Sequence, residues 1–239
     1  MVKNHLKRLA APGIWKIKRK ERTFITKQSP GPHNIKRSLP VSEILKTILK
    51  EVKTRREAKY VINNKSITID KKPINTIKFS VGLMDVVDLP EKGESYRCLI
   101  NTRGHIILIK INEKESEIKP LKVTKKSMIH GGKLQITTHD GRNFLDKKLK
   151  VNVGDTIVFD LKNKKVLETI SFENGSLIFL TEGSHIGKLA KIKEIIIKND
   201  LQKAKIMVEI EGKEYNTLKK YGFVIGKTKP VISLGIKNE

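Results

Sequence analysis

The spacing of apolar residues changes along the chain. A stripe at helical spacing follows Ser42 and comprises Ile44, Leu45, Ile48, Leu49 and Val52. From residue 95 onward, short apolar runs recur about every ten residues and are separated by turn residues. This succession predicts helices first and many short strands later, which is typical of an α+β chain of several small modules.

A second short helix is predicted after residue 54. Thr54 and Glu57 have the spacing of a capping box, in which the two residues satisfy each other's backbone N–H groups. The helical period places Ala58, Val61 and Ile62 on the inward face. A strand over residues 66–70 should follow, and residues 70–73 should turn it back. The outward face near the helix start, where N–H groups and the dipole favour phosphate, holds Arg55, Arg56 and Lys59.

The second half of the chain predicts two small β domains. Residues 96–100 and 106–111 flank a hairpin turn. Further strands over 134–137, 151–153, 156–161 and 166–170 should complete a small barrel or sandwich. Strands over 177–180, 192–197 and 204–210, with a glycine-spaced loop at 183–188, predict the last domain.

The first 40 residues have no sustained period. Pro30-Gly31-Pro32 favours extended or turn backbone. We expect a basic arm that cannot fold alone and that orders on a partner. Its Trp15 lies among cations and is expected to stack on bases or to cover an apolar patch.

The net charge of the chain limits the kinds of partner that it could bind. The chain has 239 residues, 50 Lys and Arg against 25 Asp and Glu, and a formal net charge of +25. Residues 1–40 hold 11 basic residues and 1 acidic residue, and eight of the nine arginines lie at or before Arg103. A polyanionic partner would relieve the self-repulsion, so nucleic acid and an anionic membrane surface are the candidates, and a free-standing enzyme for neutral substrates is disfavoured.

Other chemistry has little support in the sequence. No apolar run approaches the roughly 20 residues of a membrane span, and the basic N-terminus lacks the apolar core of a signal peptide. The single Cys98 excludes an internal disulfide and a cysteine zinc site, and the six histidines show no ligand spacing. We expect a protein of the reducing cytosol without a metal or cofactor.

Residues 54–59, Thr-Arg-Arg-Glu-Ala-Lys, with the apolar pair and short strand that follow, resemble the S-four-type RNA-binding module, an αL motif. In that family the second helix and its start contact RNA. The resemblance implies that the contacts are made by Lys53, Arg55, Arg56, Lys59 and Lys65.

The loop Gly183-Ser184-His185-Ile186-Gly187-Lys188 between strands resembles a KOW motif, a small SH3-like barrel of ribosomal proteins and transcription elongation factors. The third glycine of that motif would fall at Ala190, which is a departure from the pattern.

The order of elements over nearly the whole chain resembles the archaeal and eukaryotic small-subunit ribosomal protein family S4e. The residues that carry the resemblance are His5-Leu6-Lys7-Arg8, Ala10-Ala11-Pro12 with Trp15, Gly31-Pro32-His33, Leu39-Pro40, 82–86, 138–140, 151–156, 223–227, 229–230 and 232–234. Val231 departs from the tryptophan usual in the family. The resemblance implies a structural, non-enzymatic component of the cytoplasmic 30S subunit that binds 16S rRNA beside neighbouring ribosomal proteins, with no membrane or small-molecule partner.

The sequence therefore predicts an α+β multi-module chain in four parts. These are a basic extended N-terminal arm (1–41), the S-four-type module (42–105), a central small β-barrel-like domain (106–170) and an SH3-like KOW β-barrel with a C-terminal tail (171–239). The predicted RNA contacts are Lys3, His5, Lys7, Arg8, Trp15, Lys16, Lys18, Arg19, Lys20, Lys36, Arg37, Lys53, Arg55, Arg56, Lys59, Lys65, Lys188 and Lys227.

Two other functions stay open at this point. Asp140, in the run His139-Asp140-Gly141-Arg142, would be the catalytic residue of an RNA-modifying enzyme of the pseudouridine-synthase type, although no large catalytic domain follows. A KOW-type transcription elongation factor is the second. A P-loop at residues 222–228 is excluded, because its glycine spacing is one residue short and no long helix follows.

Overall fold

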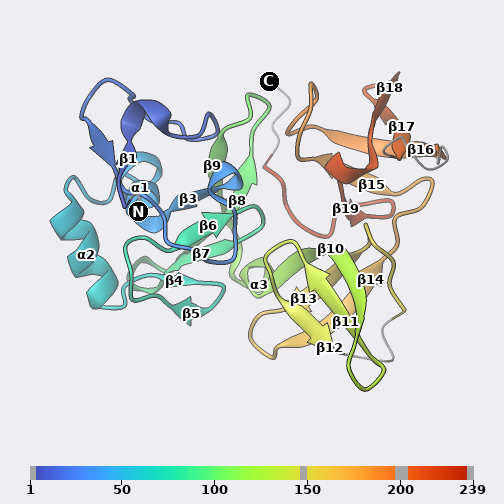
Figure 1. Cartoon of the computed structure of the whole chain (residues 1–239), viewed down its shortest axis with the longest axis horizontal. Coiled ribbons are helices and arrows are strands. Elements are labelled where there is room, and N and C mark those ends of the chain that lie inside the picture. Colours follow the sequence, from blue (N-terminus) through green and yellow to red (C-terminus); the bar gives the residue numbers. More distant parts are fainter. Residues whose placement is uncertain (1–3, 146–149, 197–203, 236–239) are drawn as a thin grey trace. The chain divides into compact units, whose positions relative to one another are not determined.

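The computed structural model describes residues 4–145, 150–196 and 204–235, and the chain divides into two compact units (Figure 1). Unit 1 comprises residues 1–100 and 104–117, and unit 2 comprises residues 101–103 and 118–239. Antiparallel strands predominate in both units, and helices are few. The protein is therefore mostly β-sheet, with less helix than the α+β prediction implies.

Unit 1 contains three antiparallel sheets. Two of them are pairs, β1 (Leu6–Lys7) with β2 (Phe24–Ile25) and β3 (Ser38–Pro40) with β6 (Ser80–Gly82). The third has five strands in the order β5 (Lys72–Pro73), β4 (Thr68–Ile69), β7 (Val86–Leu89), β8 (Glu94–Ile100) and β9 (Ile106–Ile111). Short 3-10 turns lie at Arg8–Ala10, Ile35–Arg37 and Pro90–Lys92.

The helices of unit 1 are short. The helix predicted after residue 41 is α1 (Val41–Glu43), which continues into a π-turn over Ile44–Ile48, where the N–H of Leu49 donates to the carbonyl of Ile44 at 3.0 Å. The apolar stripe still buries Ile44 and Leu45. The second predicted helix is α2 (Arg55–Asn63), and a single turn, α3 (Glu113–Ser116), follows β9.

The N-terminal arm is part of the core of unit 1. Its residues Ala11, Trp15, Ile25 and Leu39 pack in one apolar cluster with the residues of α1, α2 and the five-stranded sheet. The described arm residues are thus folded on the module that follows them. The sequence predicts an arm that folds only on a partner. The structure instead shows an arm anchored in the core of unit 1 by apolar side chains that include these four.

Unit 2 contains two five-stranded antiparallel sheets. The first has the order β12 (Asn143–Leu145), β11 (Lys133–Thr138), β10 (Ile118–Ile129), β13 (Thr156–Asp160) and β14 (Lys165–Ile170). The second has the order β18 (Lys213–Leu218), β17 (Lys205–Ile210), β16 (Leu189–Ile196), β15 (Leu177–Leu180) and β19 (Gly222–Gly226), with a 3-10 turn at Lys219–Tyr221. The predicted strand 192–197 corresponds to β16, and its last residue lies outside the described part of the chain.

The compact units divide the chain differently from the four predicted parts. β9 pairs with β8 from Ser95↔Ile111 to Ile100↔Ile106, so the first unit extends beyond residue 105. In unit 2, Val158 and Ile170 of the first sheet share an apolar cluster with Ile178 and Val224 of the second. A boundary at residue 170 therefore separates two sheets that bury each other's apolar faces.

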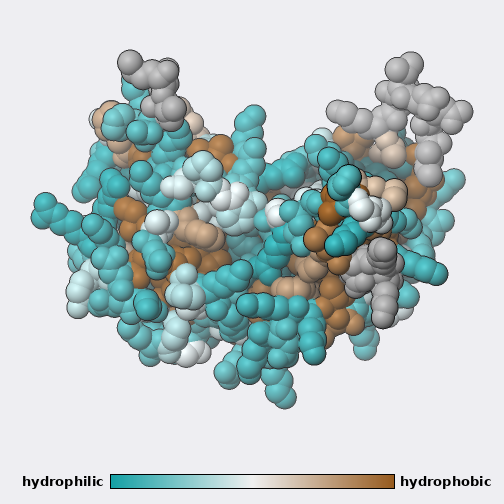
Figure 2. Space-filling view, turned by 60° about the horizontal axis from the view of Figure 1, so that its bottom comes forward, coloured by the Kyte–Doolittle hydropathy of each residue, from teal (hydrophilic) through white to brown (hydrophobic). Residues whose placement is uncertain are grey.

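The surface is largely hydrophilic, and apolar side chains gather in separate patches on the face shown in Figure 2. Within the described residues, no helix is both long and apolar enough to cross a membrane.

Candidate nucleic-acid interface

The capping box fixes the start of α2. The Thr54 hydroxyl accepts from the N–H of Glu57 at 3.2 Å, and the Glu57 carboxylate accepts from the N–H groups of Lys53 at 2.8 Å and Thr54 at 3.4 Å. The N–H of Lys53, and then the Thr54 hydroxyl, lower the pKa of Glu57. The predicted capping box is thus confirmed. Because it depends on residues only three or four positions apart, the local sequence was enough to predict it.

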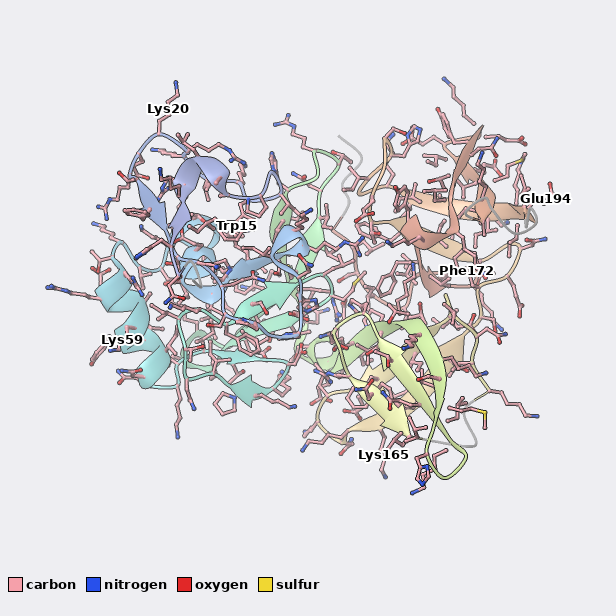
Figure 3. The ribbon with its side chains drawn as sticks, viewed as in Figure 1. Trp15, Lys20, Lys59, Lys165, Phe172 and Glu194 are labelled. Atoms are coloured by element: carbon pink, nitrogen blue, oxygen red, sulfur yellow. The ribbon has the colours of Figure 1, made fainter. Side chains whose placement is uncertain are left out.

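The two faces of α2 differ as predicted. Ala58 and Ile62 are buried and Val61 is half-buried against the core, whereas Arg55, Arg56 and Lys59 are exposed. Figure 3 shows Lys59 pointing away from the body of unit 1. The helix start therefore presents three cations to solvent beside N–H groups that favour anions.

A hollow of about 650 Å³ lies between this face of α2 and the segment 75–78. Its lining residues are Arg55, Arg56, Lys59 and Lys78 together with Ser29, Asn75, Thr76 and Ile77. Lys78 also lines two neighbouring hollows, and Arg55 lines one of them. We call the surface that joins these hollows the basic groove. Its exposed or half-buried cations are Arg22, Lys27, Lys46, Arg55, Arg56, Lys59 and Lys78, and the buried Arg8 also lines one of the hollows.

The sequence analysis missed four members of the basic groove: Arg22, Lys27, Lys46 and Lys78. They come from the arm, from the π-turn and from the turn before β6, so no local spacing joins them to α2. The only signal in the sequence was the arginine bias, which pointed to the first hundred residues as a whole.

Several predicted contacts of the arm are exposed but do not line the groove: Lys7, Lys16, Lys18, Lys20, Lys36 and Arg37. Lys20 points outward from its loop (Figure 3). His5 is exposed and lines one of the hollows. Lys53 and Lys65 are exposed at the two ends of α2, and Lys3 lies outside the described residues.

Two predicted contacts of the arm are buried, and this corrects their assignment. Trp15 is 1% exposed, and its Nε1–H donates to the carbonyl of Ser38 at 2.7 Å, so it offers no face for stacking on RNA. Arg8 is 4% exposed, and its Nη1 donates to the carbonyl of Lys18 at 3.0 Å and lies 3.5 Å from a Glu21 carboxylate oxygen. Both residues hold the arm in place.

Arg19 has a similar positioning role. It is half-buried, and its guanidinium donates to the carbonyls of Ala11 at 2.8 Å and Pro12 at 3.1 Å. These bonds close the loop from Ala11 to Arg19, which contains Trp15.

Trp15→Phe should lower the free energy of unfolding by about 2 kcal/mol, because it removes the donor to the Ser38 carbonyl and leaves a small void. It should leave the salt dependence of RNA binding unchanged. Urea unfolding and RNA titrations at several salt concentrations measure the two effects. A reduced salt dependence at unchanged stability would mean that Trp15 contacts RNA after all.

The remaining two predicted contacts belong to unit 2. Lys188 is half-buried, and its Nζ lies 3.2 Å from a carboxylate oxygen of Glu211. Lys227 is exposed directly after β19.

Asp140 is a structural acid. It is 4% exposed, and one carboxylate oxygen lies 3.2 Å from Lys119 Nζ and 2.9 Å from Arg142 Nε. Burial opposes ionisation, but Lys119, followed by His139, Thr138 and Arg142, lowers the pKa of Asp140 to about 2. No group of His, Cys, Asp and Glu within the described residues could hold a metal ion.

Comparison with known proteins identifies the family. The sequence model described as Ribosomal family S4e matches residues 92–166, and that of the RS4NT (NUC023) domain matches residues 2–36. The protein called small ribosomal subunit protein eS4 of Methanothermobacter thermautotrophicus is 41% identical over 233 residues, which cover 97% of this chain and 96% of the relative. The chain belongs to the ribosomal protein family S4e. The expected family resemblance is thereby confirmed.

Other S4e proteins agree. The small ribosomal subunit protein eS4 of Korarchaeum cryptofilum is 38% identical over 233 residues, with 96% of each chain covered. The crystal structure of the 30S ribosomal protein S4e from Thermoplasma acidophilum matches with a TM-score of 0.70 at 31% identity, over 80% of this chain and 96% of that one.

The motifs that carry the S4e resemblance meet in the structure. His33 Nε2 lies 2.9 Å from Asp85 Oδ2, both side chains are buried, and that carboxylate also accepts from the N–H of Gly82 at 2.8 Å. A Cβ on Gly82 would lie 2.4 Å from the His33 ring. The arm motif and the residue 82–86 motif of the S4e chain are therefore two sides of one packed contact.

Proposed function

We propose that this protein binds 16S rRNA and that the basic groove of unit 1 is its main contact surface. As a member of the S4e family, the protein is a structural component of the small ribosomal subunit, in the cytoplasm. The observation that carries the proposal is the groove itself, in which seven exposed or half-buried cations line neighbouring hollows around the start of α2. A surface of this charge and curvature suits the backbone of folded RNA.

The groove would act mainly through phosphate. Each cation that neutralises a phosphate releases condensed counterions, which makes binding favourable and dependent on salt. Arg55 and Arg56 present planar forks that can grip a phosphate with two donors each, whereas Lys59 and Lys78 act as point charges. Because the capping box fixes the start of α2, both arginine side chains project from a rigid part of the backbone. They would therefore set the register of the RNA on the groove.

The module names remain part of the proposal. The segment from α1 to β4, with its capped helix and outward cations, supports an S-four-type module. The sheet from β15 to β19 supports a KOW-type barrel, with the glycine-spaced loop 183–188 between β15 and β16. The exposed lysines of the arm and of unit 2 would add weaker contacts with rRNA and with neighbouring ribosomal proteins.

The residues favour binding over catalysis. Asp140, the acid that the enzyme hypothesis needs, is buried between Lys119 and Arg142. A carboxylate held in this way stabilises the fold of unit 2 and is not positioned against a substrate.

Sedimentation of a lysate of the source cells in high magnesium tests the proposal. The protein should run with the small subunit, resist a moderate salt wash and, after ultraviolet irradiation, yield crosslinks to 16S rRNA at groove residues such as Arg55 and Lys78. Protein at the top of the gradient, or crosslinks to 16S rRNA confined to unit 2, would overturn the proposal.

A further inference from the structure

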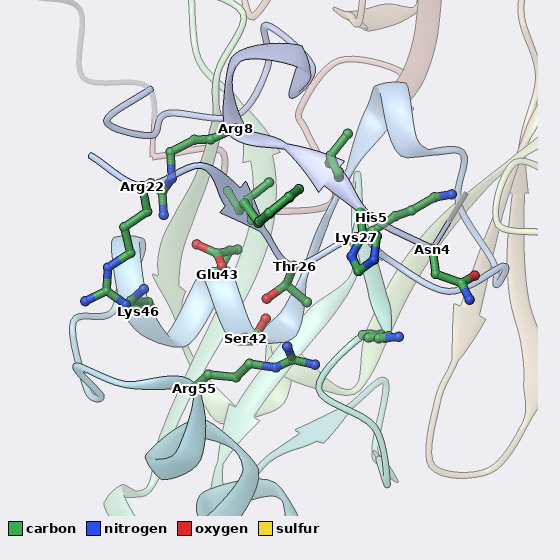
Figure 4. A pocket seen from close by; sticks show the side chains of 14 residues that line it. Asn4, His5, Arg8, Arg22, Thr26, Lys27, Ser42, Glu43, Lys46 and Arg55 are labelled. Carbon is green, nitrogen blue, oxygen red and sulfur yellow. The ribbon is translucent and has the colours of Figure 1, made fainter. Parts of the chain in front are cut away.

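One hollow of the basic groove contains a buried acid. It has a volume of about 320 Å³, at the lower end of the range of about 300–1,000 Å³ for small-molecule sites. The side chains of Ser42, Glu43 and Thr26 lie at its centre, with Arg8, Arg22 and Lys46 to one side and Arg55 below (Figure 4). A purely phosphate-binding surface has no use for a carboxylate at this place.

Glu43 is 4% exposed, yet its Oε2 is buried and has no hydrogen-bond partner among the described residues. Ser42, the preceding residue, is 3% exposed, and its hydroxyl is also buried without a hydrogen-bond partner among the described residues. Burying such groups without a hydrogen-bond partner is energetically costly. The Glu43 carboxylate oxygen can therefore accept from an N–H group of a ligand, and the Ser42 hydroxyl can donate to a ligand acceptor.

Aromatic rings lie in the wall of the same hollow. Phe24 is 55% exposed, which is unusual for a phenylalanine, and its ring centroid lies 5.4 Å from that of His5 at a tilt of 45°. Exposed rings beside cations are the surfaces on which proteins stack unpaired bases of RNA.

We propose that this hollow, which we call the base pocket, binds a single unstacked guanine of an RNA strand whose phosphates lie in the basic groove. The proposal rests on the RNA-binding function proposed above. Guanine carries two adjacent N–H donors, N1–H and the 2-amino group, which match a carboxylate, and its O6 can accept from the Ser42 hydroxyl. The corresponding edges of uracil, cytosine and adenine place an acceptor next to the donor, and this acceptor would face Glu43.

Short RNA oligonucleotides test the preference on the full-length protein. The probes are fluorescein-labelled hexauridylate and the same strand with one central guanine, inosine, adenine or cytosine, titrated by fluorescence anisotropy. The guanine strand should bind about tenfold tighter than hexauridylate, since a good bidentate contact discriminates by roughly that factor or more. Inosine, which lacks the 2-amino group, should lie between them, and adenine and cytosine should match uracil within about threefold.

Glu43→Gln separates base recognition from charge. It should reduce the guanine preference to about twofold or less, because one oxygen acceptor is replaced by a donor, while affinity for hexauridylate stays equal or rises, because a negative charge leaves a basic surface. The matched control is Glu51→Gln, an exposed carboxylate paired with Lys92 outside the pocket, which should keep the preference. If Glu43→Gln does not fold, Phe24→Leu at its exposed position should weaken the guanine strand more than hexauridylate.

The outcomes separate this inference from the proposed function. Equal binding of all five strands by the unchanged protein, with 16S rRNA still bound in a salt-dependent way, would overturn the base pocket alone. Loss of guanine preference in Glu51→Gln as well as in Glu43→Gln would also overturn it. Failure of every strand and of 16S rRNA to bind would remove the proposed function together with the inference.

Discussion

Replacing Arg55 and Arg56 together by alanine should weaken the binding of 16S rRNA roughly hundredfold near physiological salt, about tenfold for each charged hydrogen-bonding group. Both guanidinium groups are exposed at the capped start of α2 and line the hollow shared with Lys59 and Lys78. The slope of the logarithm of the binding constant against the logarithm of salt concentration should fall by about 1.8, because two phosphates lose their partners. Titrations at four or more potassium chloride concentrations measure both quantities.

A second double variant controls for net charge. Lys125→Ala with Lys133→Ala removes the same charge from exposed positions on β10 and β11 in unit 2. It should reduce affinity by less than about threefold, as expected for cations outside the contact surface. Equal losses from the two double variants would mean that total charge, and not the basic groove, governs binding.

Asp140→Asn should lower the free energy of unfolding of unit 2 by about 3–5 kcal/mol, the usual cost of leaving a buried charge without its partner. Lys119, 1% exposed, would keep a charge that water cannot reach. Urea unfolding followed by circular dichroism measures the loss. Lys119→Met combined with Asp140→Asn should recover most of it, because the buried charge is then absent.

The free energy of unfolding of unit 2 should depend on pH because only the ionised form of Asp140 stabilises the buried pair. The pKa of Asp140 is lowered from 3.8 to about 2, so its stabilising contribution is fully present above about pH 4 and is lost as pH falls through 2. Asp160→Asn is the matched control, since that carboxylate is half-buried, has no buried cation as an ion-pair partner among the described residues, and accepts from the turn N–H groups of Lys162 and Asn163. A loss below about 1 kcal/mol for Asp140→Asn would show that the buried pair adds little to unit 2.

Local interactions explain what the sequence could predict. The capping box of α2 joins Thr54 to Glu57, three residues apart, and its outward cations follow from the helical period. The turns at Asp70-Lys71 and Gly141 likewise depend on neighbouring residues. These features could be predicted without knowledge of any tertiary contact.

Long-range contacts explain what the sequence could not predict. The carbonyl that binds Trp15 belongs to Ser38, 23 residues away, and nothing near Trp15 distinguishes a buried indole from a stacking one. Lys78 joins the groove only because the chain returns beside α2. The two unpaired oxygens of the base pocket become visible only when the arm covers Ser42 and Glu43.

The composition of unit 1 has a consequence during synthesis of the protein. The arm, α2 and the five-stranded sheet all lie within residues 1–117, so every apolar partner of Trp15 has been made when that segment leaves the translating ribosome. Synthesis of residues 118–239 then takes roughly another 6–24 s at about 5–20 residues per second. The basic groove can therefore form while the rest of the chain is still being translated.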